Sequence, residues 1–294
     1  MDTKEPITAA GTLYICATPI GNLGDITYRA VQTLREADLI AAEDTRNSLK
    51  LLNHLDIHTP MTSYHEHNKY EKAAKLVEEL KAGKSIALIT DAGMPCISDP
   101  GQVLVNMCHE EGISVTVLPG ASACISALAI SGMDTRGFCF DGFLPPDKKQ
   151  REKVLNRLAV EERTTVFYEA PHHLKKTLKV LEGAVGSERK LTLCRELTKK
   201  HEEIIRATLG ECISLCEEKE PRGEYVLVLE GAGTEELLQE KRQAFDGMSL
   251  MEHLDLYLSA GMDKKEAMKE VARDRGISRR EVYSEYERNK EDHS

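Results

Sequence analysis

The stretch SIALITDAGMPCISDPG, from Ser85 to Gly101, decides the fold, because a short apolar run passes there into a loop of Gly, Pro, Ser and Asp. Such a run is typical of a buried strand that ends in a turn. A helical pattern follows over residues 100–111, and we expect Asp99 to be its N-cap with Pro100 at the first helical position. Strand, small-residue loop and helix in this order form the repeating unit of an α/β fold.

The same unit recurs on both sides of this stretch. Short apolar runs alternate with helix-period stretches such as 68–81 over the first 230 residues, which predicts an α/β fold with largely parallel sheets. Residues 142–153, with paired prolines and basic side chains, are expected to form a loop at or just after a domain junction near residues 120–145. The apolar runs are Thr12–Ala17, Leu39–Ala42, Ser85–Ile89, Ser114–Leu118, Thr164–Tyr168, Leu191–Cys194 and Tyr225–Leu229.

The pattern becomes wholly helical after Gly233. We expect helices over 234–244, 250–259, 264–273 and 278–286, with Gly261 and Gly276 as stop signals. The last two form a helix-turn-helix unit, and Ser278 is the expected cap of its second helix. Residues 264–280 hold seven basic and three acidic side chains, a net charge of +4 within an acidic chain.

The composition describes a globular protein that is acidic overall. Its 294 residues are 41% hydrophobic and 30% charged, and the net charge is -10. This length predicts about two or three domains. Because phosphate binding needs clustered Lys and Arg, an acidic chain does not coat nucleic acid through its overall charge, and any RNA contact must be local.

Targeting segments, disulfides and metal sites are not predicted. No apolar run has signal-peptide or membrane-span length, so we expect a cytoplasmic protein. The eight cysteines form no C-x-x-C pair, which favours buried reduced thiols, and Cys212 and Cys216 lie at helical spacing as core residues. His65-Glu66-His67 would place both imidazoles on one face of a strand, but nothing nearby supplies further ligands.

Three loops rich in small and polar residues follow predicted strands: Thr18–Gly24, Thr90–Gly101 and Pro119–Ala123. Each alone could be a tight turn. Loops at the carboxyl ends of strands in an α/β sheet converge on one crevice, so we expect all three to line a single ligand pocket. No G-x-G-x-x-G follows the first strand and no G-x-x-x-x-G-K-[ST] occurs, which disfavours a dinucleotide site and a P-loop.

Seven motifs in fixed order make the chain recognisable. Together they closely resemble the bacterial 16S ribosomal RNA cytidine 2'-O-methyltransferase family, over roughly residues 11–231 and again in the helical tail. The chain departs from the family's pattern at Met94, where threonine is usual, and at His173, where arginine is usual. The motifs are GTLYICATPIGN (11–22), AEDTR (42–46), DAGMPCISDPG (91–101), LPGASA (118–123), GFLP (142–145), FYEAPHHL (167–174) and RELTKKHEE (195–203).

The resemblance implies the tetrapyrrole-methylase fold, with S-adenosylmethionine bound between two α/β domains, usually in a homodimer. It implies a flexible tail over 1–10, methylase domains over 11–120 and 121–233, and a helical helix-turn-helix segment over 234–294. Gly21, Gly93 and Gly120 would permit close approach of the backbone to a ligand. The residues that the resemblance places around the cofactor are Ile20, Asp91, Met94, Ser122, Ala123, Tyr168, Leu197 and Val226.

Transfer of a methyl group to a ribose hydroxyl needs an in-line arrangement and a proton acceptor. Three carboxylates in the family motifs are candidate acceptors, namely Asp44, Glu169 and Glu196, although each could instead form a salt bridge or a helix cap. The expected RNA phosphate contacts are Arg46, Arg195 and Lys199, with Lys148, Lys149 and Arg151 as a further contact or a solvated loop.

Two alternatives stay open at this point. One is a tetrapyrrole or diphthine-type methyltransferase, which shares the fold and the cofactor, but AEDTR, GFLP and RELTK favour the RNA enzyme. The other is a DNA-binding regulator in which the helix-turn-helix is the functional part and the first 230 residues only sense a metabolite. The expected partner is 16S ribosomal RNA in the small ribosomal subunit.

Overall fold

The computed structural model describes residues 10–233, 245 and 247–291, with side chains up to Arg288. The helix expected over 234–244 and the tail expected over 1–10, apart from Ala10, lie outside these residues. Two compact units are present: one runs to Pro146 and resumes over Thr164–Leu229, and the other contains Asp147–Arg163 and the described residues from Glu230 on.

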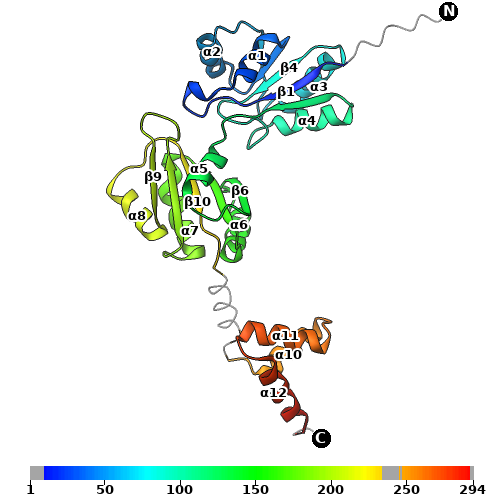
Figure 1. Cartoon of the computed structure of the whole chain (residues 1–294), viewed down its shortest axis with the longest axis vertical. Coiled ribbons are helices and arrows are strands. Elements are labelled where there is room, and N and C mark those ends of the chain that lie inside the picture. Colours follow the sequence, from blue (N-terminus) through cyan, green and yellow to red (C-terminus); the bar gives the residue numbers. More distant parts are fainter. Residues whose placement is uncertain (1–9, 234–244, 246, 292–294) are drawn as a thin grey trace, which may run out of the picture. The chain divides into compact units, whose positions relative to one another are not determined.

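The first sheet is fully parallel, in the order β3-β2-β4-β1-β5. Its neighbouring strands β4 and β1 are labelled in Figure 1. Its strands are β1 (Thr12–Cys16), β2 (Leu39–Ala42), β3 (Met61–Ser63), β4 (Ile86–Ile89) and β5 (Ser114–Leu118). The connecting helices are η1 (Leu23–Asp25), α1 (Tyr28–Glu36), α2 (Thr45–His54), α3 (Lys69–Lys81) and α4 (Gly101–Glu110).

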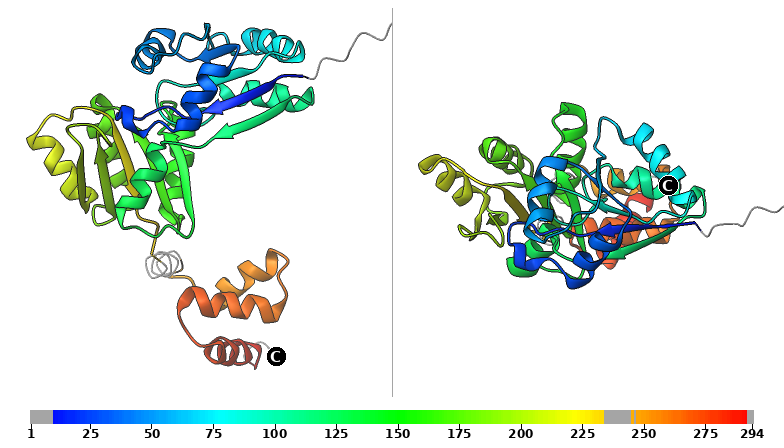
Figure 2. Two further views of the ribbon diagram at one scale, coloured as in Figure 1. Left: turned by 45° about the horizontal axis from the view of Figure 1, so that its top comes forward. Right: turned by 90° about the horizontal axis from the view of Figure 1, so that it is seen from above.

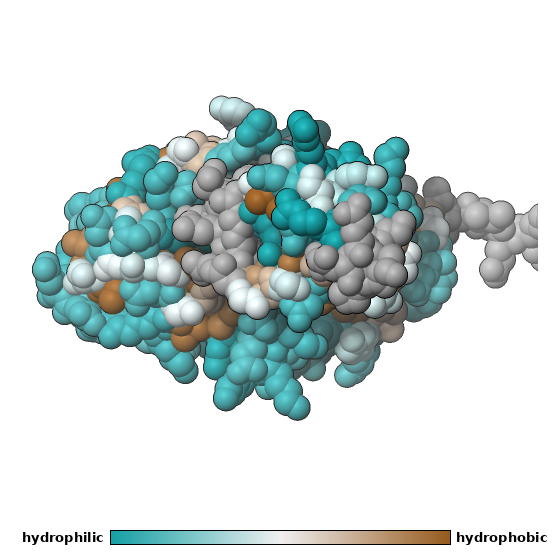
Figure 3. All heavy atoms as spheres, turned by 90° about the horizontal axis from the view of Figure 1, so that it is seen from below, coloured by the Kyte–Doolittle hydropathy of each residue, from teal (hydrophilic) through white to brown (hydrophobic). Residues whose placement is uncertain are grey.

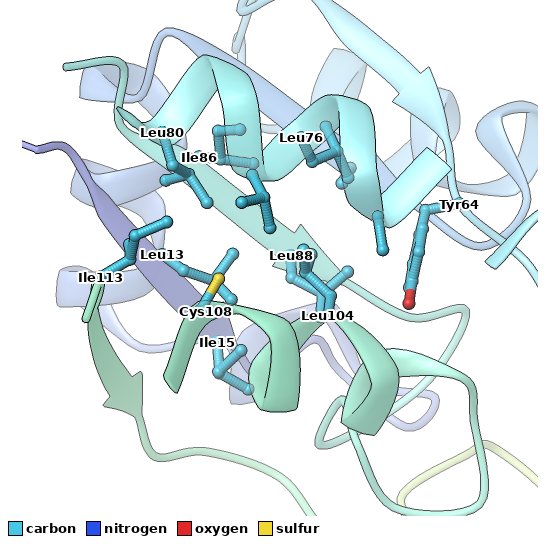
Figure 4. Close-up of a cluster of buried hydrophobic side chains, with 13 residues drawn as sticks. Leu13, Ile15, Tyr64, Leu76, Leu80, Ile86, Leu88, Leu104, Cys108 and Ile113 are labelled. Carbon is cyan, nitrogen blue, oxygen red and sulfur yellow. The ribbon is translucent and has the colours of Figure 1, made fainter. Parts of the chain in front are cut away.

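Helices cover both faces of this sheet because alternate strand residues point to opposite sides. Ile86 and Leu88 of β4 pack with side chains of α3 and α4, such as Leu76 and Leu104 (Figure 4). The neighbouring β4 residues Ala87 and Ile89 pack instead with α1 and α2. Covered on both faces, β4 reads in the sequence as one continuous apolar run.

The second sheet has the order β6-β7-β10-β8-β9, and the expectation of a parallel sheet is wrong for most of it. Only β6 and β7 pair in parallel among its described strands, whereas β10 runs antiparallel to both of its neighbours and β9 to β8. The elements are α5 (Ala123–Ser131), β6 (Phe138–Phe143), β7 (Thr164–Glu169), α7 (Pro171–Val185), β8 (Lys190–Arg195), β9 (Glu203–Thr208), α8 (Leu209–Glu218) and β10 (Tyr225–Leu229).

An apolar run indicates that both faces of a strand are buried, but it does not indicate whether the strand is parallel or antiparallel to its neighbours. Helix α5 covers one face, where Leu128 packs with Val166 and Val228. Helix α8 packs against β8, β9 and α7. These central strands are therefore as buried as those of a parallel sheet, which explains the wrong prediction.

The second compact unit contains α6 (Lys148–Val160), α10 (Leu250–Ser259), α11 (Lys264–Arg275) and α12 (Arg279–Glu291). The last three pack against one another in a small helical group (Figure 2). Leu254, Val271 and Val282 are buried in its apolar cluster. Gly276 ends α11 with a left-handed φ of 64°, and Ser278 and Glu281 cap α12 reciprocally, so the predicted helix-turn-helix is confirmed.

Three further local predictions are wrong. Residues 142–153 are not a loop, because β6 ends at Phe143 and Asp147 caps α6 by accepting a hydrogen bond from Gln150 N. Helix α4 begins one residue late, at Gly101, although Asp99 Oδ1 does accept from Gly101 N at 2.8 Å. His65 lies just after β3 and outside any strand, and Glu66 and His67 lie in a turn.

The surface seen in Figure 3 is mostly hydrophilic with small apolar patches, as a chain with 30% charged residues requires. In the part of the chain that the structure describes, no helix is long and apolar enough to cross a bilayer. No cluster of metal-ligating side chains was found among the same residues. All eight cysteines are unbridged, and Cys212 and Cys216 are buried.

Candidate functional site

The loop from Thr90 to Gly101 is the centre of the site. Cys96 and Ser98 adopt left-handed φ values of 72° and 67°, a costly conformation for residues with a side chain. Asp99 holds the loop in this form, since its Oδ1 accepts hydrogen bonds from Cys96 N and Gly101 N. A second support is the buried Tyr64, whose hydroxyl donates to Pro100 O at 2.9 Å.

The first loop is fastened to this central loop. Thr18 and Gly93 exchange two backbone hydrogen bonds of 2.9 and 3.1 Å, and the Thr18 hydroxyl donates to Thr90 O. Gly93 has a φ of 81°, and a Cβ there would lie 3.1 Å from Ile20 Cγ2. A glycine is therefore required where the two loops touch.

The three small-residue loops converge on one cavity of about 420 Å³, as expected from the parallel sheet. That volume is within the usual range of roughly 300–1,000 Å³ for small-ligand sites. The expected cofactor residues that line it are Ile20, Asp91, Gly93, Met94, Ser122, Ala123, Tyr168 and Val226. Residues from both sheets thus meet at a single hollow.

The other three expected cofactor residues lie elsewhere. Gly21 lines an adjoining cavity, where the side chain of Lys199 fills the space that a Cβ would occupy. Gly120 lies against Ala17, and its missing Cβ would be 2.8 Å from the Ala17 Cβ. Leu197 is 7% exposed and belongs to the apolar cluster around Val226.

Tyr168 connects the second sheet to the start of α5. Its hydroxyl accepts a hydrogen bond from Cys124 N at 3.2 Å, and burial raises the pKa of the phenol. Its ring meets Phe140 and Phe143 edge-on, with centroids 4.9 and 5.9 Å apart. Ser122 is the N-cap residue of α5, yet its side chain makes no capping bond and lines the cavity.

Of the three expected proton acceptors, Glu169 is the one that lines the cavity. It is 6% exposed, and its two oxygens accept from Ala170 N at 2.8 Å and from the Thr177 hydroxyl at 2.5 Å. Asp44 caps α2 through Arg46 N, and its hydrogen bonds to the Arg46 guanidinium lower the pKa of Asp44 to about 2.

Glu196 is the third, and it is bound within the protein. It has a left-handed φ of 51°, and its Oε1 accepts from Lys199 Nζ at 2.8 Å and from Glu224 N at 2.9 Å. Burial alone would raise the pKa of Glu196, but these hydrogen bonds outweigh burial and the pKa is lowered. Lys199 Nζ also donates to Glu224 Oε2 at 2.8 Å.

The expected phosphate contacts are spread over the fold. Arg46 is 87% exposed beside Asp44, whereas Arg195 donates to Arg222 O and Glu203 and lines a separate cavity of about 190 Å³. Lys148 and Lys149 are exposed on α6, where Lys148 lies 3.8 Å from Glu152, and this helix belongs to the other compact unit.

Sequence reasoning missed three carboxylates of the cavity, Glu43, Asp99 and Glu224. Glu43 Oε2 accepts from the Thr90 hydroxyl at 2.5 Å. Burial raises the pKa of Asp99, whose buried Oδ2 has no hydrogen bond among the described residues. Glu43 and Asp99 both lie inside the quoted motifs, so their motif membership was an available signal.

Comparisons with known proteins identify the family of the chain. The profile of the family described as Tetrapyrrole (Corrin/Porphyrin) Methylases matches residues 12–213. The chain is 48% identical over 276 residues to a protein of Halalkalibacterium halodurans named ribosomal RNA small subunit methyltransferase I, covering 94% of both chains. A protein of the same name from Bacillus subtilis is 47% identical over 276 residues, with the same coverage.

A solved structure with the same fold is uroporphyrin-III C-methyltransferase from Thermus thermophilus, complexed with S-adenosyl homocysteine. It is 18% identical, gives a TM-score of 0.54, and the match covers 75% of this chain and 97% of that one. At this identity the likeness shows the fold alone.

Proposed function

Because the chain belongs to the tetrapyrrole methylase family, and within it to the ribosomal RNA small subunit methyltransferase I group, we propose that it methylates the ribose 2'-hydroxyl of a cytidine in 16S ribosomal RNA. It is a methyltransferase that depends on S-adenosylmethionine. The observation that carries the proposal is the 48% identity over 94% of both chains. Uroporphyrin-III C-methyltransferase, an example of the tetrapyrrole-type alternative, is 18% identical to this chain, well below the 48% of the ribosomal RNA relative. The regulator alternative leaves the methylase match over 12–213 without a role.

The residues of the cavity fit S-adenosylmethionine. Ile20, Met94 and Val226 supply apolar walls for an adenine ring, and Ser122 supplies a hydroxyl without a capping bond. Asp91 supplies a carboxylate that can face a positive group. Its orientation is fixed, because it accepts from Asp44 N at 3.2 Å and from Asn47 Nδ2 at 3.1 Å.

The bound cofactor supplies an electrophilic methyl group on a sulfonium. With the cofactor held by residues such as Ile20, Met94 and Asp91, the ribose oxygen would bond to this carbon in place of the sulfur, and the hydroxyl proton would pass to a carboxylate of the chain. The chain contributes position and a proton acceptor. We keep Asp44, Glu169 and Glu196 as the proposed acceptors, and the geometry favours Glu169 because it alone of these three lines the cavity.

The setting of the reaction is also proposed. We infer a homodimer and a cytoplasmic enzyme acting on the small subunit, with methylase domains over 11–120 and 121–233 and a helical segment after 233. The strands of the two sheets, which end at Leu118 and begin at Phe138, support the first boundary. Arg46, Arg195, Lys148, Lys149 and Lys199 are the proposed phosphate contacts.

The test is transfer of labelled methyl groups to small ribosomal subunits from cells that lack the enzyme. A methylated 2'-hydroxyl resists alkaline cleavage, so one protected cytidine should appear when both enzyme and cofactor are present. Reactions without cofactor are the control. Methyl groups on a base carbon or nitrogen would refute the assignment, as would a protected nucleotide in another RNA only.

A further inference from the structure

A second cavity, of about 310 Å³, adjoins the cofactor cavity. The two share Ile20, Asp91, Ala92 and Glu224 as a common wall. The cofactor residues expected from the sequence, apart from Gly21, leave the rest of this second cavity without a role. The common wall is the part of the cofactor cavity that the second cavity reaches.

The lining of the second cavity combines apolar and cationic groups. Leu23, which is 43% exposed, and Leu51 are apolar surfaces on η1 and α2. Lys50 and Lys199 bring ammonium groups. An apolar surface beside cations suits a nucleotide, whose base needs a nonpolar contact and whose phosphate needs a positive charge.

The two lysines differ in their ion-pair partners. Lys199 forms ion pairs of 2.8 Å with Glu196 and Glu224, so its charge is largely neutralised. Lys50 is exposed, its ammonium lies 3.4 Å from Asn47 Oδ1, and no ion pair of Lys50 was found among the described residues. Arg46 lies one helical turn before it on α2, so Lys50 extends a cationic edge toward the cavity.

We propose that this second cavity receives a single unpaired nucleotide of the RNA, with its ribose at the common wall, its base against Leu23 and Leu51, and a flanking phosphate at Lys50. The proposal rests on the proposed function. A hollow of about 310 Å³ admits one splayed nucleotide but not a duplex, and RNA-modifying sites select unpaired nucleotides for the same reason.

The two lysines of the second cavity have different roles. Lys50 binds the phosphate beside the target nucleotide, and Lys199, itself a proposed phosphate contact, also holds Glu224 at the common wall. Asn47 connects the two cavities, because its amide donates to Asp91 Oδ2 while its oxygen faces Lys50.

The test compares Lys50→Ala with Lys75→Ala, which removes the same charge from an exposed lysine of α3 that is outside both cavities. Loss of one phosphate contact should raise the KM for small subunits about five- to tenfold and lower the slope of log KM against log salt by about one. Cofactor affinity measured by calorimetry should be unchanged. Lys50→Arg should keep the KM for small subunits close to that of the wild type.

Leu23→Ser provides a second, exposed variant that should also raise the KM for subunits without changing the affinity for cofactor. If Lys50→Ala and Leu23→Ser behave as Lys75→Ala does, the second cavity does not hold the nucleotide. If either variant weakens cofactor binding as much as it weakens subunit methylation, the cavity belongs to the cofactor and the inference is wrong. Wild-type protein that binds cofactor but does not methylate subunits would instead contradict the proposed function itself.

Discussion

Replacement of Asp91 by alanine isolates the electrostatic part of cofactor binding. The side chain lines the cofactor cavity and accepts two hydrogen bonds, from Asp44 N and Asn47 Nδ2. No apolar core is lost, because Asp91 is exposed at the end of β4. The substitution therefore removes one carboxylate and leaves the cavity walls in place.

The structure limits the expected losses of folding stability and of cofactor affinity. Each of the two long, exposed hydrogen bonds contributes about 0.5–1 kcal/mol, so the free energy of unfolding should fall by about 1–2 kcal/mol. A hydrogen bond that involves a charged group contributes roughly 1.5–3 kcal/mol, and solvent access at Asp91 favours the lower end. The Kd for S-adenosylmethionine should therefore rise about tenfold.

Calorimetric titration with S-adenosylmethionine measures the Kd, and urea unfolding measures the stability. Asp38→Ala is the matched control, since Asp38 Oδ2 accepts from Ser85 N at 2.8 Å at the opposite end of the same strand. It should lose stability without losing affinity. A Kd for Asp91→Ala within twofold of wild type would refute the reasoning.

Three further predictions follow from charges outside this contact. Arg46→Gln should raise the pKa of Asp44 from about 2 toward 3.8, which NMR of its carboxyl carbon measures. The Asp44–Arg46 pair stabilises the folded protein above pH 3.8, and this contribution is lost as pH falls through about 2. The variant should therefore lack this loss of stability in the acid range. Burial, and after it the charge of Arg275, lowers the pKa of His253. The helices α10–α12 should therefore be fully stable above pH 6.5 and lose stability as pH falls below that value. Hydrogen exchange should show this decline, and an equal decline in His253→Gln would contradict the prediction. Truncation after Gly233 should leave cofactor affinity nearly intact and reduce subunit methylation most at low salt, where phosphate contacts of residues 264–280, with their net charge of +4, are least screened. Wild-type rates across a salt series would contradict a role of these helices in docking the RNA.

The sequence predicted seven of the ten described strands, because each of these seven contains a short apolar run. It missed β3, β6 and β9, whose residues are not fully buried and give no such run. Strand direction in the second sheet also escaped prediction, since β10 is buried on both faces whether its neighbours are parallel or antiparallel. Apolar patterning thus indicates which strands are buried on both faces, whereas the direction in which strands pair is known only from the structure.

The sequence predicted that the three loops line one cavity, because loops that follow parallel strands converge at one edge of the sheet. It was less complete for carboxylates. Asp44 and Glu43 are adjacent in one motif, yet Asp44 bonds to Arg46 on α2 while Glu43 bonds to Thr90 inside the cavity. Which of two neighbours turns inward depends on where β2 ends, and that boundary is not encoded in a motif.

The contact between Gly21 and Lys199 has a consequence for how such chains can diverge. A single methyl group at position 21 would lie 2.4 Å from Lys199 Cγ, and the lysine cannot simply swing away because two glutamates hold its ammonium. The two positions, 178 residues apart, are therefore epistatic: a lineage that replaces the glycine must shorten residue 199 at the same step or lose the Glu224 contact. Swapping one half of the chain between related enzymes would expose this dependence as an incompatibility at a single pair of residues.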